Sequence, residues 1–234
     1  MTDRLFKIWV NPLQFLEVDE PWASAPELHL DLEALVRFAT TPGTPPDLQT
    51  LVERYREISH EPVRLFAAPV EQRVLDKLVW PLRHAKAAYM FGNYLGTIAM
   101  GGMVAEMIAI LLFDIGEIRI NNVPLTDRGQ VEIFGGAFEK LSQHRRVSIL
   151  HAYGMIDDPL REAFELIRER RRRYLHFWSQ DHDALPGDAR SVFNAAVLVT
   201  VSAIGQGLQE GKLILNPRFV KWLDRFDPDQ RQEE

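Results

Sequence analysis

A concentration of positive charge beside one histidine is the feature of this sequence best suited to chemistry. Five of the six positions from 168 to 173 are arginine, and His176 follows three positions after the last of them. Histidine transfers protons near neutral pH, and guanidinium groups bind phosphate through paired, charge-assisted hydrogen bonds. The run therefore predicts a site for phosphate chemistry. Its arginines are Arg168, Arg170, Arg171, Arg172 and Arg173.

The run lies in a predicted helix that begins at Asp158 and ends near Gln180. Asp158 suits the N-cap position, and Pro159 suits the first helical position. At about 100° per residue, Arg171 falls on the apolar face of this helix, where a core residue is expected. A buried guanidinium needs a carboxylate or phosphate partner, and Glu106 is the candidate. The rest of the apolar face consists of Leu160, Phe164, Ile167, Tyr174, Leu175 and Trp178.

His176 lies five positions after Arg171, about 140° away around an ideal helix. The two side chains therefore border one cleft only if a second subunit or a neighbouring helix closes over the end of this helix. In that arrangement His176 is the acid or base, and Arg171 stabilises the negative charge that develops on phosphorus. The alternative is a solvated face on which arginines pair with nearby glutamates, as Arg168 can with Glu165.

The elements that carry these residues are predicted to be helices, so the fold class is all-α. No pair of alternating strands is convincing in the sequence. Residues 118–124 are expected to connect two helices, with Asn121 and Asn122 as the turn. Thr126 is expected to cap the short helix that follows this connector. The expected helices span 70–90 (kinked at Pro81), 93–115, 127–134, 138–153, 158–180, 188–209 and 217–226.

The N-terminal residues 1–69 are predicted to form an arm rather than part of the bundle. Repeated prolines break this segment, which leaves room for short helices at 28–40 and 47–59. Its aromatic residues suggest that the arm docks on the main helical domain, residues 70–226. Residues 227–234 form a polar tail.

Composition excludes several classes of site. The 234-residue chain has no cysteine, so it has no disulfides and no cysteine-based metal sites. Its seven histidines show no metal-ligand spacing, and we predict no metal and no cofactor. The net charge of -6 limits any contact with nucleic acid to a local patch. No secretory leader opens the chain, which favours a cytoplasmic protein.

One segment, residues 94–113, is almost wholly apolar and long enough to span a bilayer. It contains Glu106 and several small residues, including Gly101 and Gly102, and no cluster of basic residues follows it. These features favour a buried central helix over a membrane span, with small residues that let neighbouring helices approach closely. We therefore expect no membrane partner.

The pattern Arg-x4-His, formed by Arg171 and His176, resembles the signature of HEPN domains. Those domains are all-α bundles of four or five main helices in which the motif lies on a late helix. Two copies of the motif usually meet across a dimer interface. The resemblance covers roughly residues 70–210, and it implies a HEPN-like bundle that forms a homodimer.

Many members of that superfamily are metal-independent endoribonucleases. The resemblance therefore implies cleavage of single-stranded RNA, in which the ribose 2′-hydroxyl attacks the adjacent phosphorus. His176 would be the acid or base, Arg171 would hold the scissile phosphate, and Glu106 would support Arg171. The substrate-binding residues would be Arg168, Arg170, Arg172 and Arg173, which attract phosphate, and Tyr174, which could stack on a base.

The superfamily also contains inactive members that bind or scaffold. The residue after the motif arginine is commonly Asn, Asp or His in active members, and here it is Arg172. Arg170 offers an alternative x5 spacing to the same histidine. The second interpretation is a catalytically inactive module that dimerises or binds a nucleotide or protein partner. In that module Arg171 pairs with Glu106, and His176 packs at the dimer interface.

Overall fold

The computed structural model describes residues 47–59, 75–120, 123–176, 181–205, 207–209, 212–214 and 216–224. Most of this backbone is helical, which confirms the all-α prediction. Two short antiparallel hairpins correct the expectation that the chain has no strand pairs. The predicted helix at 28–40 and the polar tail lie outside the described residues.

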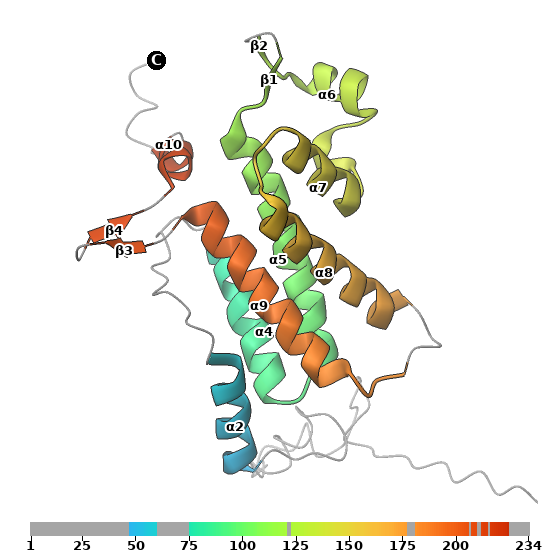
Figure 1. The fold of residues 1–234 in the computed structure, drawn as a ribbon, viewed down its shortest axis with the longest axis vertical. Coiled ribbons are helices and arrows are strands. Elements are labelled where there is room, and N and C mark those ends of the chain that lie inside the picture. Colours follow the sequence, from blue (N-terminus) through green and yellow to red (C-terminus); the bar gives the residue numbers. More distant parts are fainter. Residues whose placement is uncertain are drawn as a thin grey trace, which may run out of the picture.

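Helix α5 (Tyr94–Gly116) lies at the centre of the bundle (Figure 1). It begins as predicted at Asn93, whose side chain accepts a hydrogen bond from the Gly96 amide at 2.9 Å. Three helices pack on it: α4 (Trp80–Met90), α8 (Asp158–His176) and α9 (Leu185–Ile204). The fully buried apolar side chains of α5 are Ile98, Val104, Ala105, Ile108 and Ala109.

Two glycines bring α8 and α9 close to α5. A Cβ atom on Gly101 would lie 2.7 Å from Cγ1 of Val192 in α9. A Cβ atom on Gly102 would lie 2.5 Å from Cδ of Arg171 in α8. Both separations are shorter than van der Waals contact, so the absence of a side chain permits this approach. The predicted role of the small residues in close helix packing is confirmed.

The same helix has the length and composition of a membrane span. Among the described residues, α5 is the one helix that meets this test, with a mean hydropathy of 2.0 over its most apolar stretch. Within the bundle 56% of that stretch is buried. Core helices of soluble proteins pass the same test, so the finding is weak evidence for a span.

The predicted helix at 70–90 is described from Leu75. It begins as a π-helical turn, η3 (Leu75–Val79), and continues as α4 with Pro81 in its first turn. Proline lacks an amide hydrogen and interrupts the α-helical hydrogen-bond pattern. The change of helix type lies between Val79 and Trp80, next to Pro81, and the kink predicted at this proline stays a prediction.

Helix α2 (Leu48–Ser59) contacts α4 and α9. Asp47 precedes it and accepts a hydrogen bond from the Thr50 amide at 2.6 Å, which is the expected helix start. The Tyr89 hydroxyl of α4 donates to Glu57 of α2 at 2.9 Å. Burial and this carboxylate together raise the pKa of Tyr89. The described helix of the N-terminal segment is thus bonded to the bundle.

Between α5 and α8, the chain differs from the prediction at residues 138–153. A short hairpin, β1 (Arg119–Ile120) and β2 (Val123–Pro124), leads to α6 (Asp127–Phe134), which Thr126 caps as expected. The single helix expected at 138–153 is instead a 3-10 turn, η4 (Phe138–Lys140), followed by α7 (Gln143–Ala152).

The separation of η4 from α7 has a local cause. Leu141 has extended backbone, and Ser142 starts α7 by accepting a hydrogen bond from the Arg145 amide at 3.4 Å. The buried Arg146 side chain donates to the carbonyl of Phe138 at 3.2 Å and to that of Glu139 at 2.5 Å. These bonds hold the 3-10 turn against α7.

Helix α9 is shorter than predicted and ends before Gly205. This glycine has φ +75°, and a Cβ atom on it would lie 2.3 Å from the backbone nitrogen of Asn216. The chain then forms a second hairpin, β3 (Gly207–Gln209) and β4 (Lys212–Ile214), of which β3 lies where helix was expected. Helix α10 (Pro217–Asp224) follows, and Asn216 accepts a hydrogen bond from the Arg218 amide at 3.0 Å, as its predicted start requires.

Candidate functional site

Helix α8 carries the arginine run and is α-helical from Asp158 to His176. Its cap is Asp157 rather than Asp158, because the Asp157 carboxylate accepts a hydrogen bond from the Leu160 amide at 3.0 Å. Asp158 is already in the first turn, where its charge suits the helix N-terminus. The start predicted from the Asp-Pro pair is therefore one residue late.

Arg171 lies at the contact between α8 and α5, and it forms the predicted pair with Glu106. Its Nη1 donates to Oε1 of Glu106. The stem of the arginine packs over Gly102. Both side chains are about one-third exposed, at 33% and 29%. Nε of Arg171 is buried and has no hydrogen-bond partner within the described residues.

Asp188, in the first turn of α9, binds three side chains of α8 at once. Its Oδ1 lies 2.9 Å from Nε of Arg170, and its Oδ2 lies 3.4 Å from Nη1 of Arg173. Oδ2 also accepts a hydrogen bond from the Tyr174 hydroxyl at 2.7 Å. Burial and this neighbouring carboxylate raise the pKa of Tyr174. Asp188 is the main site residue that sequence reasoning missed; its place at a helix start was the signal available.

Arg168 is also paired, with a glutamate of its own helix. Its Nε lies 2.6 Å from Oε2 of Glu165, as the spacing of three residues predicts. Oε1 of Glu165 lies 2.9 Å from Nδ1 of His144 on α7. Burial raises the pKa of Glu165, but the hydrogen bonds from His144 and Arg168 outweigh it and hold that pKa below its ordinary value. A second pair, His151 with Asp158 at 3.1 Å, joins the same two helices.

His176 is the last residue of α8, and its side chain is exposed. Within the described part of the chain, it forms no hydrogen bond or ion pair. Since α8 is helical over this stretch, His176 and Arg171 point about 140° apart. A single chain therefore does not bring the two motif side chains together. Arg172 is exposed as well.

On the apolar face of α8, Tyr174 is buried as predicted, which conflicts with its expected stacking role, and Leu175 is not buried. Tyr174 is only 7% exposed and its hydroxyl is bonded to Asp188, so its ring is not available for stacking on a base. Leu175 is 38% exposed rather than buried. Phe164 and Ile167 are fully buried, as predicted, and Trp178 lies outside the described residues.

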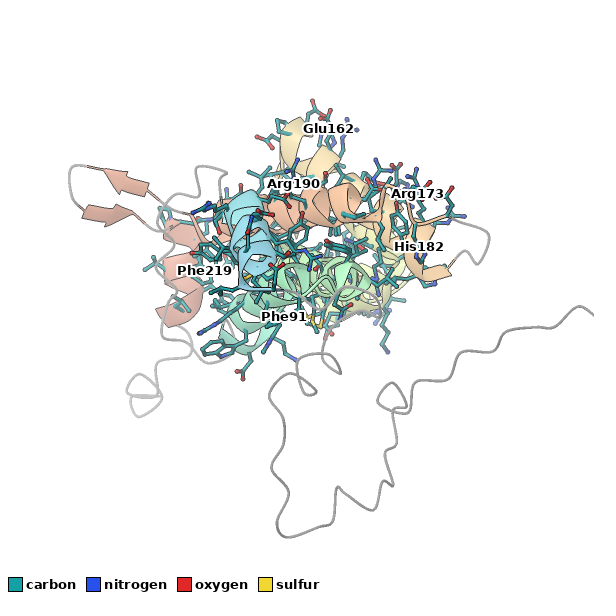
Figure 2. All side chains as sticks on the ribbon, turned by 90° about the horizontal axis from the view of Figure 1, so that it is seen from below. Phe91, Glu162, Arg173, His182, Arg190 and Phe219 are labelled. Atoms are coloured by element: carbon teal, nitrogen blue, oxygen red, sulfur yellow. The ribbon has the colours of Figure 1, made fainter. Side chains whose placement is uncertain are left out.

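The end of α8 and the loop before α9 lie together. The rings of Tyr174 and His182 are edge to face, with centroids 5.8 Å apart. Figure 2 shows Arg173 and His182 on the same side of the molecule. No group of three or more histidine and acidic side chains able to hold a metal gathers anywhere in the described ranges.

Taken together, the described contacts place four of the five arginines beside carboxylates of the same chain. The acids are Glu106 on α5, Glu165 on α8 and Asp188 on α9. The excess positive charge expected from the sequence is therefore largely balanced within the fold. No family model matches this chain, and neither the curated proteins nor the solved structures contain a match to it.

Proposed function

We propose that this chain is a catalytically silent HEPN-like module that self-associates through the face around Arg171 and Glu106. The observation that carries the proposal is the internal pairing of the arginine run. A phosphate binding there would compete with Glu106, Glu165 and Asp188, which already pair with four of the five arginines.

The burial of Asp188 strengthens this argument. Its side chain is 13% exposed, and two guanidinium groups and one hydroxyl surround it. A carboxylate so placed needs its partners, because an unpaired charge at low exposure is costly. Phosphate that recruited both Arg170 and Arg173 would leave Asp188 with only the Tyr174 hydroxyl as a partner. The pairing therefore favours a structural role for Arg170 and Arg173 over a role in substrate binding.

The face around the Arg171–Glu106 pair supports self-association. Met103 is 40% exposed and lies three positions before Glu106, on the same side of α5. Leu175 is 38% exposed and lies four positions after Arg171, on the same side of α8. Exposed apolar side chains thus flank the ion pair on both helices. A second copy can cover them with the same face, as a twofold dimer requires.

Sedimentation of the full chain tests the association. Wild type is expected to form a dimer, and Met103→Glu with Leu175→Glu is expected to be monomeric, because carboxylates in the interface lack partners. Val131→Glu is the matched control: this residue is 54% exposed on α6, away from the face, and its variant is expected to remain dimeric. A monomeric wild type at all concentrations would overturn the proposed interface.

Metal-independent ribonuclease activity is the second candidate, and one observation favours it: His176 is exposed and free of bonds within the described residues. In a dimer, the histidine of one copy could face the arginine of the other. The 2′-hydroxyl would then lose its proton and attack phosphorus, the bond to the 5′-oxygen would break, and that oxygen would take up a proton. The products would be a 2′,3′-cyclic phosphate and a 5′-hydroxyl end.

Incubation of mixed-sequence single-stranded RNA with the protein in excess EDTA separates the two candidates. The silent module predicts no cleavage by wild type. Cleavage that disappears in both Arg171→Ala and His176→Ala, but persists in His182→Ala, would overturn the silent module and establish the nuclease. Circular dichroism of each variant controls for loss of the fold.

A further inference from the structure

A cavity of about 350 Å³ opens between the end of α2, the start of α4 and the second half of α9. Ligand pockets range from roughly 300 to 1,000 Å³, so this one suits a small ligand. The lining residues of α9 begin at Phe193. Asp188, which pairs with Arg170 and Arg173 of the arginine run, lies before them on the same helix. The cavity is therefore separate from the candidate site on α8.

The walls of this cavity are mainly aliphatic. Val79 and Leu82 contribute from η3 and α4, and Val197 and Val201 contribute from α9. Ile58, at the end of α2, is 1% exposed and closes the third side. Such a lining favours an apolar group of the ligand, since burying it removes apolar surface from water.

Two cations on successive turns of α4 complete the lining, Arg83 and Lys86. Among the described residues neither is paired with a carboxylate. The Arg83 guanidinium lies over the ring of Trp80, 5.5 Å from its centroid. The Lys86 ammonium lies over the ring of Tyr55, 4.3 Å from its centroid. In a chain of net charge -6, two cations whose contacts with described residues are aromatic rather than acidic attract an anion.

The last residue of α2 supplies a further polar group. The Ser59 hydroxyl is buried in the lining, and it has no hydrogen-bond partner in the described structure. A buried hydroxyl without a partner is costly, and a bound oxygen acceptor removes that cost. The cavity thus combines apolar walls with three lining side chains that can each donate a hydrogen bond to an anion.

We infer that this cavity binds a free alkyl carboxylate of medium chain length. The alkyl chain lies against the aliphatic walls. The carboxylate accepts hydrogen bonds from Arg83 and Lys86, and the Ser59 hydroxyl donates to it. This inference does not rest on the proposed self-association or on any ribonuclease activity.

Calorimetric titration of the full chain with decanoate, below its micelle concentration, tests the inference. We expect saturable binding of one decanoate per chain. Decanol, which has the same alkyl chain without the charge, is expected to bind at least about tenfold more weakly, the factor that corresponds to one charge-assisted hydrogen bond. Equal binding of decanol and decanoate would overturn the assignment of the anion site.

Three variants locate the binding. Val197→Trp fills the cavity and is expected to abolish binding of both ligands. Arg83→Ala with Lys86→Ala is expected to weaken decanoate about tenfold and to leave decanol unchanged. Arg128→Ala removes an exposed cation of α6 that pairs with Glu132, and it is expected to bind decanoate like wild type.

Two results would overturn the inference. The first is the absence of saturable decanoate binding to wild type. The second is unchanged decanoate affinity in the Arg83→Ala, Lys86→Ala variant, whose partly exposed positions preserve the fold even if Val197→Trp destabilises it. Far-UV circular dichroism and thermal unfolding verify that each variant is folded.

Discussion

Arg171 of α8 donates a hydrogen bond to Glu106 of α5, a residue 65 positions earlier in the chain. This pair joins the arginine-rich helix to the central helix at the point where Gly102 lets the two backbones approach. The same bond occupies the arginine that an Arg-x4-His nuclease would use for phosphate. The pair is therefore both a packing contact and the strongest argument for a silent module.

Replacing Arg171 by Met keeps the stem over Gly102 but removes the charge. We expect this variant to lower the free energy of unfolding by about 1–2 kcal/mol, because Glu106 loses its partner while only about one-third exposed. Glu106→Gln in the same chain is expected to restore most of the loss. A urea-unfolding double-mutant cycle measures the coupling. Additive losses in the double variant would contradict the pairing.

Asp188→Asn is expected to release Arg170 and Arg173 from α9. The variant should bind single-stranded RNA several-fold more tightly than wild type, because two guanidinium groups become available for phosphate. The free energy of unfolding of this variant should also be about 1–2 kcal/mol lower than that of wild type. Filter binding at low salt measures the affinity. Glu132→Gln is the control, since it makes the same charge change and frees Arg128 on α6, yet should leave RNA affinity unchanged.

Gly101→Ala is expected to destabilise the bundle by about 1–3 kcal/mol, although alanine is the better helix former. The cause is overpacking, because the new Cβ would lie 2.7 Å from the Val192 side chain. Gly187→Ala is the matched control in the first turn of α9, where nothing lies within 4 Å of an added Cβ. This control should stabilise the protein by up to about 1 kcal/mol. Thermal unfolding of the two variants measures both effects. Equal shifts of the midpoint temperature with the same sign would refute close packing at Gly101.

Acid should weaken the contact between α7 and α8 through Glu165. Its pKa in the folded protein is lower than its ordinary value of 4.5, so its stabilising effect is fully present above that value. The effect is lost as the pH falls through the folded pKa, when protonation removes the charge that His144 and Arg168 face. We expect Glu165→Gln to lower stability by up to about 1 kcal/mol at pH 7 and by less at pH 4. Glu162→Gln, on the same helix, is the control; a constant difference at both pH values would contradict the assignment.

Helix starts could be predicted where a single side chain decides them. Asn93, Thr126 and Asp47 each accept a hydrogen bond from an amide three positions later, and each lies at a helix start that the sequence predicted. Where two candidates adjoin, type alone was insufficient: Asp157 and Asp158 both suit a cap, and the structure uses the first. The local signal identifies a helix start to within one residue.

Elements fixed by contacts distant in the sequence were missed. The second hairpin depends on Gly205, which permits the approach of the Asn216 backbone, and the sequence alone placed this glycine inside a helix. Tyr174 was correctly placed among apolar residues, yet its hydroxyl is bonded to Asp188, 14 positions later. The pairing of Arg171 with Glu106 was predictable because a charge on an apolar face needs a partner, and α5 offered one acid on its apolar stretch.

Synthesis of the chain imposes an order on the neutralisation of its arginines. Glu106 precedes Arg171, so that partner is already made when α8 is translated. Asp188 follows Arg173 by 15 positions, so Arg170 and Arg173 acquire their carboxylate only after α9 begins to emerge and docks. A chain that stalls between these helices carries Arg170 and Arg173 without their carboxylate partner. Docking of α9 is therefore the step of synthesis that neutralises these two arginines.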